Sequence, residues 1–147
     1  MKYKQCEAPA HLAVEEAKAA GYDNPGLLVE RILAGLPVEE FDALRNMLGL
    51  SVEAMAAKIG VSVATLHRRR TRHQPLDRDH SDRLMRYARL YWLSLRFFDG
   101  KPEAARRWLQ HPAHALGGAS PLDFAETEMG AREVEDLIGR LEYGVYV

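Results

Sequence analysis

The hydrophobic residues of this chain recur at intervals of three and four along most of its length, and no segment alternates convincingly between apolar and polar residues. Intervals of three and four place side chains on one face of an α-helix, whereas strict alternation is typical of a strand. The clearest stripes are Val38, Phe41, Leu44 and Leu48, then Leu84, Ala88, Tyr91, Leu95 and Phe98, and finally Val134, Leu137, Ile138 and Leu141. The pattern predicts an all-α fold.

Prolines and glycines mark the ends of the predicted helices. Asn24 followed by Pro25 is typical of a helix start. A second helix begins at Pro37 and ends at Gly49, because glycine readily adopts the left-handed backbone that closes many helices. The same signals predict further helices over about 81–98, 101–111 and 130–141.

Two short helices are predicted over about 51–60 and 62–73, with Ser51 and Ser62 as their N-caps. A helix-turn-helix needs a small residue where its helices cross, a glycine that allows a left-handed turn, and apolar residues that hold the second helix. The sequence supplies Ala56 at the crossing, Gly60 at the turn and, as apolar anchors, Met55, Ile59, Val61 and Leu66. We therefore predict a DNA-binding helix-turn-helix.

The second helix of such a motif lies in the major groove, where its exposed N-terminal residues meet base edges. The residues predicted to face the bases are Ser62, Val63, Ala64, His67, Arg68 and Thr71. Val63 and Ala64 suit thymine methyl groups, and Arg68 suits a guanine edge. Phosphates, which fix register rather than sequence preference, are predicted to be met by Arg69, Arg70, Arg72 and His73.

A helical hairpin with a solvated, arginine-rich end is the alternative interpretation of the same segment. Three consecutive arginines, Arg68 to Arg70, sweep about 200° of a helix, so they do not all face one groove. We expect at least one of them to pair with an acidic residue of the protein itself. Arg69 also takes a position where many such helices carry an apolar residue, so the second helix is expected to be held differently.

The charged residues are unevenly distributed, although the formal net charge is only −1. Residues 66–89 contain eight arginines and three aspartates, a local charge of +5, whereas residues 122–147 contain seven acids and two arginines, a local charge of −5. A near-neutral total is not the composition of a generic polyanion binder. Charge separated in this way favours two surfaces for two different partners.

The remaining composition suits a reducing cytoplasm without membrane contact. The chain has one cysteine, Cys6, so no disulfide forms within it. The N-terminal residues include acids where a signal peptide needs an apolar stretch. The most apolar window, residues 90–98, is too short for a membrane span and contains an arginine. We therefore expect a cytoplasmic protein.

A series of spaced motifs in the second half resembles the toxin-binding domain of the Xre/MbcA/ParS-type antitoxins. The residues that carry the resemblance are Trp108-Leu109, Pro112, Leu116-Gly117-Gly118, Pro121-Leu122-Asp123, Gly130, Val134, Leu137 and Gly144. The predicted helix-turn-helix resembles the Xre-like part of the same family. The likeness covers about residues 36–147 and implies an Xre-like helix-turn-helix module over 36–75 and a helical toxin-binding domain over 81–147. It says little about residues 1–35, which we expect to form an N-terminal helical extension.

The resemblance also implies a function. Such antitoxins belong to type II toxin–antitoxin systems and neutralise a RES-domain toxin, which uses NAD either by degrading it or by ADP-ribosylating a protein. The antitoxin's C-terminal segment blocks the NAD pocket, and the complex represses its own operon through the helix-turn-helix. The partners expected on this basis are the RES-domain toxin, operator DNA and a second copy of the chain, in a homodimer and in a heterotetramer or larger assembly with the toxin.

The last residues, RLEYGVYV, are more apolar and aromatic than an ordinary chain end. By the resemblance they form the toxin-binding plug, which consists of Arg140, Glu142, Tyr143, Gly144, Val145, Tyr146 and Val147. Tyrosine brings a large, rigid contact area, and Glu142 suits cations that otherwise hold a cofactor's phosphates. The alternative is that Val145 and Val147 complete the protein's own core, as a short C-terminal strand.

No constellation of catalytic residues stands out, so we expect no enzyme activity, no cofactor and no metal site. His111 and His114 have no nearby cysteine or paired carboxylate and are interpreted as helix-end histidines. Gly117-Gly118 lacks the longer glycine pattern of a phosphate loop. The remaining alternative is a helix-turn-helix transcriptional regulator whose C-terminal half only dimerises or binds a small ligand.

Overall fold

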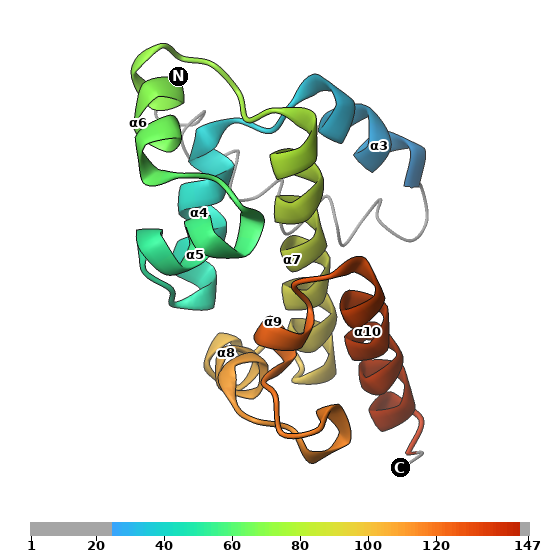
Figure 1. Cartoon of the computed structure of the whole chain (residues 1–147). Helices are drawn as coiled ribbons and strands as arrows, with labels where there is room; N and C mark the ends of the chain where they lie inside the picture. Colours follow the sequence, from blue (N-terminus) through green and yellow to red (C-terminus); the bar gives the residue numbers. More distant parts are fainter. Residues whose placement is uncertain (1–24, 145–147) are drawn as a thin grey trace. The chain divides into compact units, whose positions relative to one another are not determined.

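The computed structural model describes residues 25–144, and every regular element in that range is a helix (Figure 1). In chain order the elements are α3 (Pro25–Ala34), α4 (Val38–Leu48), α5 (Val52–Ile59), α6 (Val63–Thr71), α7 (Arg78–Phe97), α8 (Pro102–Gln110), the 3-10 helix η2 (His114–Leu116), α9 (Pro121–Phe124) and α10 (Glu128–Glu142). The predicted all-α fold is confirmed. The alternative of a C-terminal strand concerned Val145 and Val147, which lie outside the described residues.

The chain divides into two compact units, Met1–Arg89 and Leu90–Val147. The division falls inside α7, so the first part of this helix belongs to one unit and its last part to the other. The described part of the first unit also contains α3 to α6, and that of the second contains α8 to α10.

The predicted helix ends are present at the two short helices. Ser51 accepts the backbone N–H group of Ala54 at 3.1 Å and thereby caps α5. Ser62 accepts the N–H group of Thr65 at 3.0 Å and caps α6 in the same way. Gly49 closes α4 with a φ of 73°, in the left-handed region. The local sequence signals therefore fixed these boundaries correctly.

Helices α4, α5 and α6 pack against one another and surround the core of the first unit (Figure 1). The predicted stripe of α4 faces this core, since Phe41, Leu44 and Leu48 are fully buried. Burial of such side chains contributes roughly 1.5–3 kcal/mol each. Other side chains with almost no exposure in this unit are Leu36, Met55, Ile59, Leu66, Leu76 and Leu84.

In the second unit α9 packs against both α8 and α10. The backbones of α9 and α10 come so close at Gly130 that there is no room for a side chain. A Cβ at this position would lie 1.8 Å from the carbonyl oxygen of Phe124. Thr127 accepts the Gly130 N–H group at 3.0 Å, so α10 begins at Glu128 rather than at Gly130, where the predicted helix starts. The predicted apolar stripe of α10 is buried at Val134, Leu137 and Ile138.

A buried ion pair joins α3 to α4. The Glu40 side chain is fully buried, and its carboxylate accepts a hydrogen bond from Nη2 of Arg31, whose side chain is 21% exposed. Burying a carboxylate is costly unless a cation and hydrogen bonds compensate for the lost hydration. Arg31 therefore fastens α3, the helix in the described part of the predicted N-terminal extension, to α4 within the first unit.

Removing one partner of this pair should destabilise the protein strongly. We expect Arg31→Ala to lower the free energy of unfolding by about 3 kcal/mol, because Glu40 then stays buried without this cation. The double variant Arg31→Met/Glu40→Leu should recover most of the loss, since it removes both charges. Urea unfolding followed by circular dichroism measures both effects. A single variant as stable as the parent protein would show that the pair contributes little.

Candidate functional site

The helix-turn-helix of the first unit consists of α5 and α6. Gly60 between them has a φ of +77°, so the turn takes the left-handed backbone for which glycine was predicted. Ala56, the predicted crossing residue, is only 2% exposed. The predicted apolar anchors are all buried: Met55, Ile59, Val61 and Leu66. The motif predicted from spacing is therefore present.

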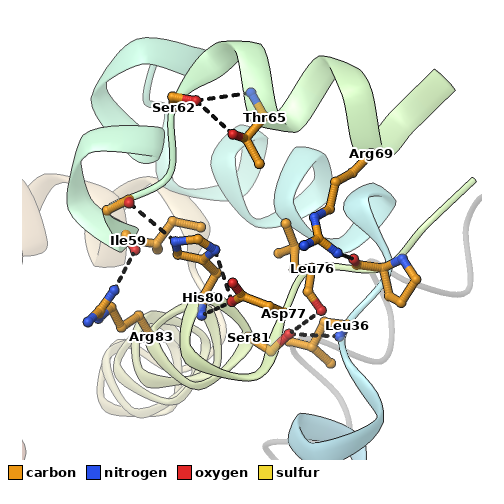
Figure 2. Close-up of polar contacts among 12 residues, drawn as sticks. Leu36, Ile59, Ser62, Thr65, Arg69, Leu76, Asp77, His80, Ser81 and Arg83 are labelled. Atoms are coloured by element: carbon orange, nitrogen blue, oxygen red, sulfur yellow. Dashed lines mark hydrogen bonds and ion pairs between the residues drawn. The ribbon is translucent and has the colours of Figure 1, made fainter. Parts of the chain in front are cut away.

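Three side chains on the first turns of α7, which we call the collar, contact this motif and the segments beside it: His80, Ser81 and Arg83 (Figure 2). Nη1 of Arg83 donates to the carbonyl oxygen of Ile59 at 3.2 Å, and Nε2 of His80 lies 3.2 Å from the carbonyl oxygen of Gly60. A helix leaves its last carbonyl groups without internal partners. The collar therefore supplies polar partners at the end of α5.

Ser81 is fully buried and ties together the segments that precede α4 and α7. Its hydroxyl oxygen accepts the Leu36 N–H group at 2.9 Å, and the hydroxyl donates to the Leu76 carbonyl at 3.4 Å (Figure 2). The N–H group of Leu76 in turn donates to the Leu36 carbonyl at 2.9 Å. The collar was not predicted from the sequence, where its only signal is the polar stretch RDHSDR at the start of a helix that later becomes apolar.

The residues predicted to read bases lie on the exposed side of α6. Val63 is 44% exposed, and the others that are exposed are Ser62, Ala64, His67, Arg68 and Thr71. The Ser62 hydroxyl donates to Oγ1 of Thr65 at 2.9 Å, and the Thr71 hydroxyl donates to the carbonyl of Arg68 at 3.0 Å. Since these two hydroxyl groups have partners within the helix, the main candidates for base contacts are Val63, Ala64, His67 and Arg68.

The three consecutive arginines of α6 lie in different surroundings. Nη1 and Nη2 of Arg70 both donate to the Asp42 carboxylate, Nη2 at 3.3 Å, and this bonding raises the pKa of Arg70. Nη1 of Arg69 donates to the Pro75 carbonyl at 2.6 Å (Figure 2), which ties α6 to the segment before α7. Arg68 is exposed and has no acidic partner among residues 25–144. The expectation that one arginine pairs with an acid of the protein is confirmed.

Arg72 and His73, both predicted to meet phosphates, are exposed at the end of α6. Arg72 is the C-cap of the helix, and His73 has a φ of 54°, a left-handed backbone that is uncommon for residues other than glycine. The N–H group of the next residue, Gln74, donates to the Arg69 carbonyl at 2.8 Å. The backbone here closes α6, and the two side chains stay accessible to a DNA backbone.

The predicted toxin-binding segment begins on the last turn of α10. Arg140 is half-buried there, whereas Tyr143, the C-cap of α10, is 84% exposed. Gly144 follows with a φ of 73° and open space around it. The rest of the predicted segment, Val145, Tyr146 and Val147, lies outside the described residues.

Glu142, one residue before this exposed tyrosine, is held by Arg96 of α7. Nε and Nη2 of Arg96 donate to the two carboxylate oxygens of Glu142, each at 3.3 Å. The same guanidinium lies 4.6 Å from the centroid of the Trp92 ring, which is a cation–π contact. The end of α10 is therefore anchored by Arg96, whose guanidinium also packs on the Trp92 ring of the same unit.

Neither a metal cluster nor a membrane-spanning helix is found in the described part of the chain. No group of three or more His, Cys, Asp or Glu side chains there is arranged to hold a metal ion. No helix there has both the length and the apolar character needed to cross a membrane. His111, the C-cap of α8, and His114, the first residue of η2, are both exposed.

Two family models match this chain. The one described as the antitoxin Xre-like helix-turn-helix domain matches residues 27–89, and the one described as the antitoxin Xre/MbcA/ParS C-terminal toxin-binding domain matches residues 95–144. A protein named Antitoxin Xre from Yersinia enterocolitica is 34% identical over 82% of this chain and 81% of its own length. Another Antitoxin Xre, from Photorhabdus laumondii, is 30% identical over 76% of this chain and 75% of its own length. A protein from a Sphingobium species, named Prs ADP-ribosylating antitoxin, is 23% identical over 88% of this chain and 94% of its own length.

A helix-turn-helix domain followed by a toxin-binding domain defines an antitoxin of a toxin–antitoxin system. The two domains imply a toxin and DNA as the partners, and neither domain family is an enzyme family. The chain belongs to the Xre antitoxin family. The resemblance drawn from the sequence motifs is thus confirmed.

Replacing Gly60 by alanine should loosen α6, and Gly117→Ala is the matched control. Both glycines have a left-handed backbone, with φ of +77° and +69°, so alanine costs about 1 kcal/mol at either position. At Gly60 the new Cβ also lies 3.1 Å from Nη1 of Arg83, whereas nothing lies within 4 Å at Gly117. We expect faster amide hydrogen exchange in α5 and α6 for Gly60→Ala only. Equal exchange rates in these helices for both variants would mean that the left-handed turn and its contact with Arg83 do not hold the two helices.

Proposed function

We propose that this antitoxin neutralises a RES-domain toxin that uses NAD, either by degrading it or by ADP-ribosylating a protein. The C-terminal segment enters the NAD pocket of the toxin, and α6 binds operator DNA to repress the antitoxin's own operon. The observation that carries the proposal is the end of α10. There the Tyr143 side chain is 84% exposed, while the preceding residue, Glu142, is held by Arg96.

When the residue before a binding segment is already held in place, the segment loses less conformational entropy on forming a complex. Arg96 binds Glu142 through two hydrogen bonds and contacts Trp92, which is only 7% exposed. In the free chain Glu142 therefore holds the helix end, and the residues from Tyr143 onward are those that enter the pocket. Tyrosine suits this role because it offers a large contact area with few rotatable bonds.

The negative charge of the C-terminal residues and the name of one relative both support a partner that uses NAD. A pocket built for an anionic dinucleotide is lined with cations, and residues 122–147 carry a local charge of −5. Complementary charge of this kind speeds association. The name of the Sphingobium relative contains the words ADP-ribosylating, which agrees with a system based on NAD chemistry.

The DNA-binding part of the proposal is supported by the arrangement of α6. Leu66 anchors the helix in the core, while Val63, His67 and Arg68 are exposed. Arg70 is held by Asp42 of α4 and so helps to orient α6 on its own domain. Operator recognition then depends on the outward side chains, and affinity depends on the phosphate contacts beside them.

Ending the chain after Glu142 should separate inhibition from folding. This truncation keeps the pair between Glu142 and Arg96 and removes Tyr143 to Val147. We expect the thermal unfolding and DNA affinity of the parent protein, but no neutralisation of the toxin encoded by the neighbouring reading frame. Neutralisation is measured as growth of cells that express this toxin and as NAD consumption by the purified toxin.

A truncated protein that still restores growth and still stops NAD consumption would count against the plug. A full-length chain that binds DNA but has no effect on that toxin would favour the alternative of a transcriptional regulator whose C-terminal half only dimerises or binds a small ligand.

Arg68→Ala should weaken binding to operator DNA by about tenfold, the effect of losing one arginine–guanine contact, and should leave neutralisation unchanged. Arg70→Ala is the comparison, and we expect it to lower stability more and DNA affinity less, because this guanidinium is bound to Asp42. Fluorescence anisotropy with promoter DNA at fixed salt measures the affinities. Loss of both DNA binding and neutralisation in Arg68→Ala would mean that this arginine serves folding.

Operator affinity should also fall steeply with ionic strength. Contact with about six phosphates lowers the affinity by roughly 10³ between 50 and 200 mM salt. A titration of the parent protein at several salt concentrations gives the slope. A flat profile would contradict binding through the exposed basic residues at the end of α6.

A further inference from the structure

The second unit carries an apolar groove whose lining includes none of the residues predicted for the plug. It has a volume of about 270 Å³ and is lined by Phe98, Ala104, Arg107, Trp108 and His111. All five residues belong to Leu90–Val147 and to the range matched by the toxin-binding domain, residues 95–144. The groove therefore lies within the domain whose family binds toxins.

Two aromatic rings form the floor of the groove. The Phe98 and Trp108 ring centroids are 6.5 Å apart with an angle of 55° between the planes, and Phe97 packs edge-on against Phe98 at 4.9 Å. Phe98 and Trp108 are both half-buried, whereas the neighbouring Leu109 is fully buried and fixes α8 in the core. Rigid, partly exposed aromatic side chains are the groups that most often dominate binding energy at interfaces.

Two basic side chains border this aromatic floor. Arg107 and His111 are one helical turn apart and both exposed, so they lie on the same side of α8. Arg106, by contrast, is bound to Glu103 at 3.0 Å. Arg107 takes part in no ion pair within the described range of the chain. An apolar floor beside an unpaired cation suits a protein segment in which an apolar residue is next to an aspartate or a glutamate.

The short tail alone is a small binding element. The five residues from Tyr143 to Val147 span at most about 18 Å when fully extended. Stable protein complexes usually bury roughly 1,200–2,000 Å², which a segment of this length does not supply. Joining a second binding element to the first raises its effective concentration and hence the affinity of the whole.

We propose that the α8 groove is a second docking site for the toxin, occupied by an aromatic or branched aliphatic side chain on an acidic segment of that protein. The apolar side chain lies on Phe98 and Trp108, and the adjacent carboxylate pairs with Arg107. The groove supplies affinity, and the tail supplies inhibition. This proposal rests on the toxin-binding domain and not on the entry of the tail into an NAD pocket.

The test uses the full-length antitoxin and the purified toxin encoded by the neighbouring reading frame. Arg107→Glu reverses the charge of the groove edge, and Ala104→Gln fills the groove without adding charge. Lys101→Glu is the matched control, because it makes the same change of charge at the start of the same helix but outside the groove lining. Isothermal titration calorimetry gives the dissociation constants, and NAD consumption at saturating antitoxin gives the inhibition. Circular dichroism melting confirms that each variant is folded.

We expect Arg107→Glu and Ala104→Gln each to weaken toxin binding by about tenfold, and Lys101→Glu by less than about twofold. All three should inhibit fully at saturation, whereas the truncation after Glu142 should bind the toxin without inhibiting it. This contrast distinguishes a failure of the groove from a failure of the plug.

Three results would contradict the proposal that the groove is a docking site for the toxin. Equal losses for Arg107→Glu and Lys101→Glu would mean general charge attraction, and unchanged affinity for Ala104→Gln would mean that the groove is empty in the complex. A change from dimer to monomer in these variants, without a change in toxin affinity, would assign the groove to a second copy of the chain. Sedimentation velocity measures that oligomeric state.

Discussion

The carbonyl groups at the end of α5 need hydrogen-bond partners, and the side chains that supply them help to position the helix-turn-helix of this antitoxin. The chain turns sharply at Gly60, and polar partners come from His80 and Arg83, twenty or more residues later. Ser81, on the same part of α7, binds the backbone of the segment that leads into α4. One stretch of α7 therefore supports the end of α5, the turn after it and the segment that leads into α4, the helix against which α5 and α6 pack. The direction of α6 follows from this turn, from buried Leu66 and from the bonds of Arg69 and Arg70, because a helix of nine residues with few buried side chains does not orient itself.

Charge counted along the sequence overstates the number of side chains available to a partner. The basic stretch 66–89 includes Arg69, Arg70 and Arg83, which bind respectively a backbone carbonyl, a carboxylate and another backbone carbonyl of the same unit. In the acidic half Glu142 holds Arg96. The separation of charge agrees with two macromolecular partners. Some residues of each charged cluster, however, form bonds that stabilise their own unit and are not available to a partner.

Interactions within four residues were predictable, and long-range polar ones were not. The apolar stripe of α4, the caps at Ser51 and Ser62 and the turn at Gly60 all depend on near neighbours, and each is confirmed. Apart from the bond between Ser81 and Leu76, the collar joins groups 20 to 45 residues apart, and it uses backbone carbonyl and N–H groups, which no side-chain pattern encodes. An acid was expected beside one arginine, yet spacing does not identify it as Asp42 of α4. The toxin-binding role predicted for the C-terminal segment came from the family resemblance, because periodicity and charge do not say which partner a chain end binds.

Leu66 is the one buried residue of α6, and folding therefore places few demands on the rest of that helix. Substitutions at exposed positions such as Val63, Ala64 and His67 change stability little but alter the surface that we propose meets base pairs. On the proposed function, in which α6 reads the operator, a few such changes after gene duplication give one copy a new operator while the other keeps the old one. Paralogous systems in a single genome can in this way become insulated, so that neither silences the other's genes.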